Sequence, residues 1–394
     1  MNLSLLWPLL GTMGAAFYFL VEATGVELWE PKLARFIFWF FLAVSGGILI
    51  SLALGFSEGR EYLEALRPFD ILLLAGLLLF LVNILGSAVK TGLTRTPVIP
   101  ILLTGALLSP ALYLPTMFFM AAPTVDEALK FLVVHLWEEG SLEILATVIL
   151  AGILIAAGLP RRRLKNLLLL EAGLVIGTGF LAIGHHYYWI GTPGFWRFLG
   201  GVASGLQVIP IFLMAKLSWQ HFKQKKKLRL PPSHSLSLNF IYASAFWNLA
   251  GAGLFGLLLA IPAFNRYAHG TYLTSAHAHM ALFGFFGQLV LGASYFILFR
   301  HRQISRRHRR RVTLSWQLLN AGLAVMAAGL IAAGLLQTYL WRVAGLDFTR
   351  VTLLLKPYLL ARAIGGTCFA AGAALLAWET AKLSWVYTRW AKRA

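Results

Sequence analysis

The stretch Phe131 to Ile144, FLVVHLWEEGSLEI, places ionisable side chains inside an apolar run. His135, Glu139 and Glu143 follow one another there at steps of four. On a helix each step of four drifts only about 40°, so the three side chains are expected on one stripe. Ionisable groups inside a membrane helix are costly unless they are paired or bound to a metal. The stretch therefore predicts a membrane helix whose polar stripe needs a partner.

The whole chain is apolar, because 59% of its 394 residues are hydrophobic and 12% are charged. This composition excludes a soluble domain and predicts an all-α bundle that spans a membrane. Runs of about 20 apolar residues predict eleven spans in a single membrane domain covering residues 1–394. The spans are expected near residues 3–24, 33–56, 70–90, 97–121, 128–158, 166–190, 196–219, 238–262, 273–299, 312–340 and 355–386.

The net charge of +19 does not indicate a nucleic-acid partner, because most of the 34 Lys and Arg residues lie in the loops on one side of the predicted bundle. The largest groups are residues 161–165, 223–229 and 300–311. The positive-inside rule makes that side cytoplasmic. Eleven spans then place the N-terminus outside and the C-terminus in the cytoplasm.

The histidines divide into two sets by depth. Six of the ten fall beside outer loops, near the outer face of the membrane: His135, His185, His186, His269, His277 and His279. The other four lie in the basic inner loops: His221, His234, His301 and His308. We expect the inner set to be solvated and the basic loops to attract anionic lipid headgroups.

Histidine at this depth has a chemical use, because neutral imidazoles bind iron and copper readily. Three imidazoles and one carboxylate favour non-haem iron, and His135, His185, His186 and Glu139 supply that set. The adjacent pair diverges by about 100° on a helix, so its last turn must loosen for both rings to reach one metal. Glu143, one turn deeper, is expected to support a ligand or carry protons.

His277 and His279 cannot share one metal, because two residues apart on a helix they point about 200° apart. They can each ligate a different haem on either side of the span. The single Cys368 excludes an intrachain disulfide and a C-x-x-C-H covalent haem site. Any cytochrome c that delivers electrons is therefore a separate chain.

The motifs HLWEEGSLE, GHHYYWIG, HGTYLTSAHAHM and QTYLWR occur in that order. By these motifs the chain resembles the catalytic subunit of bacterial nitric oxide reductase, in the haem-copper oxidase superfamily. The resemblance implies a subunit I-like bundle in the bacterial inner membrane, with its active site toward the periplasm. It also implies reduction of nitric oxide to nitrous oxide, with one or two haems b and a non-haem iron as cofactors.

The resemblance assigns roles to individual residues. It implies that His135, His185, His186 and Glu139 bind the iron, Glu143 relays protons, His277 is the axial ligand of a high-spin haem b, and His279 is an axial ligand of a low-spin haem b. Glu61 and Glu64 match an outer acidic pair associated with ion binding, for which calcium is a candidate, and with proton uptake. A membrane-anchored cytochrome c-type subunit is the expected electron donor.

The sequence departs from the family pattern in two places. The family has twelve spans, and by the match of LLGTMGAAFYF the second ligand of the low-spin haem falls just before Met1. We therefore expect the first helix and that ligand to be missing, or to be supplied by a separate peptide. Gln207 stands where the family has a glutamate, and a neutral amide cannot carry a proton.

These departures leave two alternatives open. One is a non-catalytic haem protein that binds NO or O2. The other is a divergent oxygen reductase, which Glu139 disfavours because oxygen-reducing relatives carry a tyrosine at that place.

Overall fold

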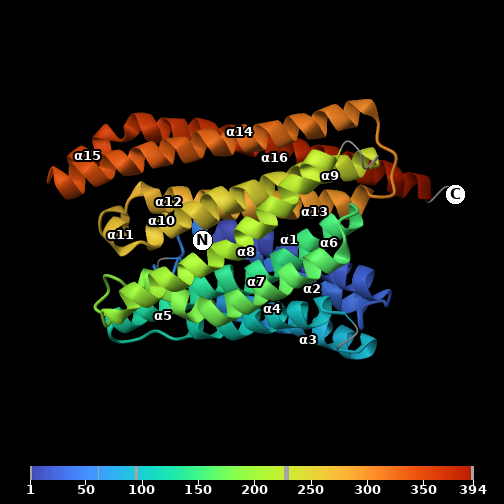
Figure 1. Ribbon diagram of the computed structural model, residues 1–394, viewed down its shortest axis with the longest axis horizontal. Coiled ribbons are helices and arrows are strands. Elements are labelled where there is room, and N and C mark those ends of the chain that lie inside the picture. The colour runs from blue at the N-terminus through green and yellow to red at the C-terminus, as the bar shows by residue number, and fades with distance from the viewer. Residues whose placement is uncertain (1, 61, 94–95, 226–229, 392–394) are drawn as a thin grey trace. The chain divides into compact units, whose positions relative to one another are not determined.

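The computed structural model describes residues 2–60, 62–93, 96–225 and 230–391, and within these ranges it contains helices, turns and loops but no strand. Eleven helical stretches of the described chain are long and apolar enough to cross a membrane. The predicted all-α fold and the predicted number of spans are confirmed. Figure 1 shows the helices as long rods that run roughly along one axis within each part of the chain.

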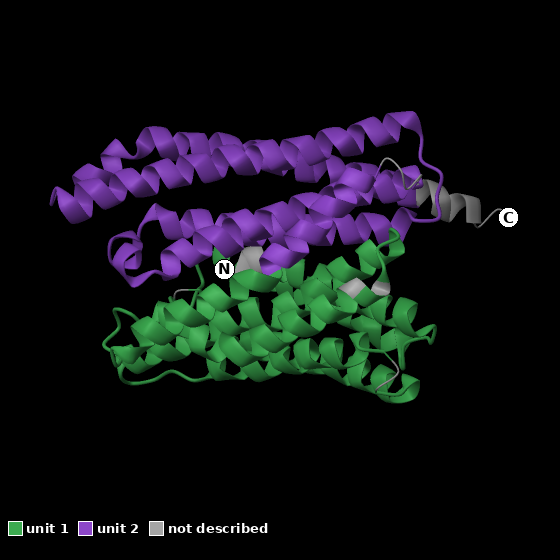
Figure 2. Ribbon diagram, viewed as in Figure 1, with its two compact units in different colours: residues 1–210 green, residues 211–394 purple. Residues whose placement is uncertain are grey.

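The chain divides into two compact units, Met1–Pro210 and Ile211–Ala394, and Figure 2 colours them separately. One long helix, α8 (Phe195–Gln224), crosses the boundary between the units. The grouping of the whole chain into a single membrane domain stays a prediction.

Unit 1 contains the elements that precede α8. They are α1 (Asn2–Thr24), α2 (Pro31–Ala53), α3 (Arg67–Thr91), α4 (Val98–Tyr113), η1 (Leu114–Met117), α5 (Pro123–His135), η2 (Leu136–Leu142), α6 (Glu143–Ala156), α7 (Arg161–Ala182) and η3 (Ile183–His186). The elements η1 and η3 are 3-10 turns, whereas η2 is a π-helical segment.

Helix α6 forms the core of unit 1, because every residue from Glu143 to Ala151 is buried. It packs against α1, α4 and α7. Two glycines permit this close packing. A Cβ on Gly105 would lie 2.9 Å from the side chain of Leu145, and one on Gly152 would lie 2.5 Å from the ring of Phe19.

Unit 2 contains the elements that follow α8. They are α9 (Pro232–Trp247), η4 (Asn248–Phe255), α10 (Gly256–Ala260), α11 (Pro262–Ala268), α12 (Tyr272–His279), η5 (Met280–Gly287), α13 (Gln288–Phe299), α14 (Arg306–Gln337), η6 (Thr338–Val343), α15 (Phe348–Leu354) and α16 (Lys356–Ala391). The segments η4, η5 and η6 are π-helical.

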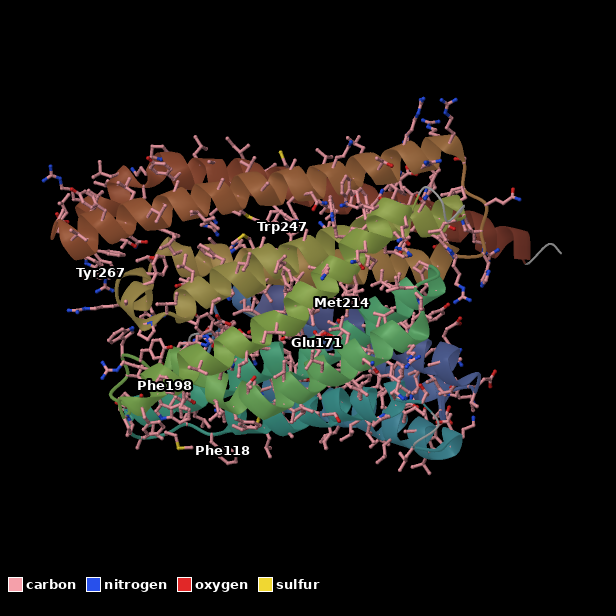
Figure 3. All side chains as sticks on the ribbon, in the orientation of Figure 1. Phe118, Glu171, Phe198, Met214, Trp247 and Tyr267 are labelled. Atoms are coloured by element: carbon pink, nitrogen blue, oxygen red, sulfur yellow. The ribbon has the colours of Figure 1, made fainter. Side chains whose placement is uncertain are left out.

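The long helices α14 and α16 lie side by side in unit 2. Their backbones approach closely at small residues, as is common between membrane helices. A Cβ on Gly322 would lie 2.6 Å from the carbonyl oxygen of Gly365. Trp247 of α9 packs into the same core and donates its indole N–H to Asn320 at 2.9 Å (Figure 3).

Local sequence signals explain where several helices begin. Proline occupies the first turn of α2, α3, α5, α9 and α11, where its missing N–H has no helical partner to lose. Side-chain oxygens of Thr271, Ser305 and Asp347 accept hydrogen bonds from the first free N–H groups of α12, α14 and α15.

The prediction that all four inner histidines are solvated is wrong for two of them. His221 is buried, and its Nδ1 lies 2.7 Å from the hydroxyl of Tyr242. His308 is buried, with the Tyr295 hydroxyl at 3.1 Å from its Nε2 and a Glu379 oxygen at 3.0 Å from its Nδ1. The basic stretches extend into helices α8 and α14, so one side of each stretch faces neighbouring helices instead of water.

Candidate metal centre

Three of the predicted metal ligands meet in unit 1. One ring nitrogen from each of His135, His185 and His186 lies within 4.8 Å of the other two. The ring centroids are 5.0 Å apart for His135 and His185, 5.2 Å for His135 and His186, and 4.1 Å for His185 and His186. Segments some fifty residues apart in the sequence therefore supply one cluster of imidazoles.

His135 lies at the junction where α5 ends and the π-helical segment η2 begins. The expectation of a continuous α-helical stripe through this stretch is wrong, because η2 inserts a wider turn between His135 and Glu143. Glu139 nevertheless remains beside His135, with its Oε1 3.5 Å from Nδ1. Glu143 opens α6 and is buried against α7 instead. Single π turns inside α-helices often occur at functional sites.

His185 and His186 lie on the 3-10 turn η3, which ends the helical run of α7. The helix end departs from α-helical geometry, as the adjacent pair required, but it tightens into a 3-10 turn instead of loosening. It packs closely against α8 because both facing residues lack side chains. A Cβ on Gly184 would lie 3.0 Å from Gly200 Cα, and one on Gly200 would collide with the backbone nitrogen of His185.

Ser204 of α8 orients the ring of His185. Its Oγ lies 3.0 Å from His185 Nδ1 and also donates to the carbonyl oxygen of Gly200 at 2.7 Å. Because the single hydroxyl proton points to Gly200, the oxygen accepts the proton of Nδ1. This assignment makes Nε2 the unprotonated nitrogen of His185, which is the form of the ring that binds a metal. Sequence reasoning missed Ser204, because no local pattern links it to a histidine nineteen residues earlier.

The chemistry of the donors fits a metal ion. His135 is buried, and neither of its ring nitrogens has a hydrogen-bond partner among the described residues. A buried polar group without a partner is costly, and a metal on one nitrogen would satisfy it. Glu139 lies outside the group of three, and 38% of its side chain is exposed. It stands next to His135, where a fourth ligand would be needed.

Apolar and aromatic groups surround the cluster. The ring of Phe131 stacks on His186 with centroids 4.7 Å apart. Phe131, Ile183 and Tyr187 form a buried cluster beside it. Tyr187 donates its hydroxyl to the carbonyl oxygen of Ala128 at 2.9 Å, and burial raises its pKa to about 12. Water is thus displaced from one side of the imidazoles, which strengthens any electrostatic interaction there.

Two further buried carboxyl groups lie close to the predicted acids, and sequence reasoning missed both. Glu138 precedes Glu139 in η2, and its Oε1 is buried without a hydrogen-bond partner among the described residues. Glu171 of α7 is 3% exposed and is bound through Oε1 to the hydroxyl of Thr147 at 2.5 Å (Figure 3). Glu171 is the one acidic residue in the apolar run 164–186, and this is a signal that hydropathy alone already contained.

His277 and His279 lie on α12. The carbonyl groups that hold their rings also belong to unit 2. Nδ1 of His277 donates to the carbonyl oxygen of Gly251 at 2.9 Å, and Nδ1 of His279 donates to the carbonyl oxygen of Ser275 at 2.7 Å. A Cβ on Gly256 would lie 2.9 Å from the His277 ring. Each hydrogen bond leaves Nε2 available to a metal, so the two residues fit the prediction of axial haem ligands.

Of the remaining predicted residues, His269 and Glu64 are described and are not members of the three-histidine group. His269 lies just after α11, in unit 2. Glu61 lies outside the described residues, whereas the Glu64 carbonyl accepts from the Glu58 N–H at 3.2 Å in the loop before α3. Ion pairs join Arg67 to Glu58 and Arg60 to Asp126 around this loop.

Gln207 of α8 is buried, and its amide nitrogen has no hydrogen-bond partner among the described residues. It lies one helical turn beyond Ser204, which contacts His185. The predicted position of Gln207 near the cluster is therefore consistent with the course of α8. Its amide cannot take up or release a proton at neutral pH.

Comparison with known proteins agrees with this fold. The family model described as cytochrome c and quinol oxidase polypeptide I matches residues 1–368. A nitric oxide reductase subunit from Stutzerimonas stutzeri is 30% identical over 397 residues, which cover 94% of this chain and 82% of that protein. The cbb3-type cytochrome c oxidase subunit CcoN1 of the same organism is 26% identical and covers 93% of this chain and 80% of that protein.

A solved structure of a haem-copper terminal oxidase dimer has the same fold, with a TM-score of 0.69 at 14% identity. The match covers 94% of this chain and 73% of that one. The family resemblance drawn from the four sequence motifs is thereby confirmed. Because a family model covers nearly the whole chain, this protein belongs to the cytochrome c and quinol oxidase polypeptide I family of membrane oxidoreductases, in the haem-copper oxidase superfamily.

Proposed function

We propose that this chain reduces nitric oxide to nitrous oxide at a centre formed by a haem b and a non-haem iron. The observation that carries the proposal is the cluster of His135, His185 and His186, with the carboxylate of Glu139 beside it. A carboxylate next to three imidazoles suits iron better than copper. The 30% identity to a nitric oxide reductase subunit over nearly the whole chain supports the same substrate.

In this proposal the three histidines and Glu139 hold the iron, His277 holds the high-spin haem b, and His279 holds a separate low-spin haem b. When bound, the metals supply the redox chemistry that converts two nitric oxide molecules, two electrons and two protons into one nitrous oxide and one water. The protein fixes the donors beforehand. Ser204 holds Nδ1 of His185, so Nε2 of that ring points away from α8. The carbonyl of Gly251 holds Nδ1 of His277, so Nε2 of that ring points away from η4. Fixed donors of this kind lose little free energy when the metal binds.

The acids and the expected partners complete the proposal. Glu143, buried one helical turn beyond Glu139, holds a proton for the reaction. Glu61 and Glu64 mark an outer site for proton entry or for a calcium ion. Electrons come from a membrane-anchored cytochrome c-type subunit. The protein spans the bacterial inner membrane, with the metal centre toward the periplasm and the C-terminus in the cytoplasm.

The test begins with the purified protein in detergent. We expect haem b and one iron per chain, copper at trace level, and release of nitrous oxide from nitric oxide when a chemical reductant is supplied. Glu139→Ala should lower both iron retention and nitric oxide consumption at least tenfold, as loss of a group beside a metal usually does. Glu27→Ala is the matched control, because it removes an exposed acid between α1 and α2 that has no part in the proposed site. Full iron and full activity in Glu139→Ala would refute the assignment.

A divergent oxygen reductase is the second candidate, and the match to a cbb3-type oxidase subunit favours it. It predicts copper in place of iron and consumption of oxygen. Binding of nitric oxide without release of nitrous oxide would instead indicate a non-catalytic haem protein. The same metal count and gas measurements separate these outcomes.

A further inference from the structure

Helices α6 and α7 bring two buried carboxyl groups together away from the histidines. Glu143 is 9% exposed, Glu171 is 3% exposed, and Thr147 between them is 4% exposed. The hydroxyl of Thr147 is hydrogen-bonded both to the carbonyl oxygen of Glu143, at 2.9 Å, and to Oε1 of Glu171, at 2.5 Å. One threonine thus links the helical turn of Glu143 to the side chain of Glu171.

Among the described residues, no cation balances this pair. Neither carboxyl forms an ion pair with any Lys, Arg or His in the part of the chain that the structure describes. The charged groups that act on Glu143 are Glu171 and Glu139, both of them acids. Two buried carboxylates without a cation cannot both be ionised at low cost, because desolvation and mutual repulsion oppose the second charge.

The hydrogen bonds at Thr147 point to a proton on Glu171. A hydroxyl has one proton, so it can donate to only one of its two oxygen neighbours at a time. A proton on the carboxyl of Glu171 would satisfy the second short contact. In addition, Oε2 of Glu171 is buried and has no hydrogen-bond partner among the described residues. An ionised carboxylate would leave that oxygen charged and unsatisfied.

The pair lies deeper in the bundle than the metal centre. Thr147 follows Glu143 by one turn of α6, on the side away from His135. Glu171 precedes His185 by fourteen residues of α7, which is about 21 Å along a helix axis. Glu171 therefore lies farther along the helices from the histidines than Glu143 does.

We propose that the Glu171 carboxyl is protonated at neutral pH and that it stores this proton for the metal centre, in addition to the proton held by Glu143. This inference rests on the proposed function. After Glu143 gives up a proton to the reaction, the proton of the Glu171 carboxyl passes to the Glu143 carboxylate. Glu171 is then ionised until a proton from bulk water replaces the one it has lost. Glu171 supplies its proton through Glu143 and does not contact the substrate.

Infrared spectroscopy of the resting full-length protein tests for the proton on Glu171 without any turnover. We expect a C=O stretching band of a protonated carboxyl at neutral pH that shifts in deuterium oxide. Glu171→Gln should remove or displace this band, and Thr147→Val should shift it because the carboxyl loses a hydrogen bond. Asp70→Asn is the matched control, since Asp70 is a buried acid of α3 bound to Tyr113 at 2.7 Å. A protonated-carboxyl spectrum that neither Glu171→Gln nor Thr147→Val alters would overturn the proposal.

Nitric oxide consumption across pH then tests the role of the stored proton. We expect Glu171→Gln to be about tenfold slower than the unsubstituted protein above neutral pH, with a smaller difference in acid, and Glu171→Asp to restore part of the rate. An unchanged pH profile in Glu171→Gln would refute the storage role. If Glu171→Gln does not fold, Thr147→Val and Glu171→Asp provide the same two comparisons. Failure of the proposed function shows as absent nitrous oxide in the unsubstituted protein, which leaves the infrared result intact.

Discussion

Replacing Ser204 with alanine should weaken metal binding without removing a ligand. Ser204 is buried, and it accepts the Nδ1 proton of His185 at 3.0 Å because its own hydroxyl proton is committed to Gly200 at 2.7 Å. Loss of a buried partner leaves Nδ1–H unsatisfied, which costs about 1 to 3 kcal/mol. A central value of about 2 kcal/mol corresponds to roughly thirtyfold in affinity. This lies within the tenfold to hundredfold range of groups that orient metal ligands.

The assay is competition for ferrous iron between the purified protein and a chelator of known affinity. We expect Ser204→Ala to release iron at a chelator concentration about thirtyfold lower than the unsubstituted protein requires. Thr178→Val is the matched control, because Thr178 bonds a main-chain carbonyl of α7 at 2.6 Å and contacts no histidine ring in the described structure. Equal iron retention in Ser204→Ala and the control would refute the assigned orientation of His185.

Three other predictions concern packing and charge. Gly200→Ala should destabilise the protein by about 2 kcal/mol and impair iron binding, because the added Cβ collides with the backbone at His185. Thermal unfolding with and without iron measures both effects. Glu379→Ala should lower the free energy of unfolding by about 3 kcal/mol, because it leaves His308 and Arg311 without their buried partner. A denaturant titration that finds no loss of stability would contradict this. Burial lowers the pKa of Lys225 to about 8 from the usual 10.5, so the unfolded state binds more protons between these values, and stability should rise with pH across that window. Lys225→Met should abolish that rise, as thermal unfolding from pH 7 to 11 would show.

Much of the architecture follows from patterns along the chain. Hydropathy alone predicts eleven spans, because a helix needs about 20 mostly apolar residues to cross the hydrocarbon core of a membrane. The positions of Lys and Arg then place His135, His185 and His186 at one depth. Donor chemistry selects these three residues as a metal set, and the structure brings their ring nitrogens within 4.8 Å of one another.

Other features depend on which helix faces meet, and residue spacing does not contain that information. The π turn after His135 alters the direction of Glu143, although an α-helical pattern predicted one stripe. The contact of Ser204 with His185 exists because two glycines let α8 approach η3.

The buried inner histidines and the paired acids also show which features the sequence predicts and which ones depend on helix packing. His308 belongs to a basic stretch that reads as a solvated loop, yet its ring is enclosed because α14 begins before it and packs against α16. Glu171 is visible in the sequence as a lone acid in an apolar run. Its link to Glu143 through Thr147 is visible only in the structure. Depth in a membrane is a property of one helix and can be read along the chain, whereas a partner belongs to a second helix and is set by the packing of side chains between them.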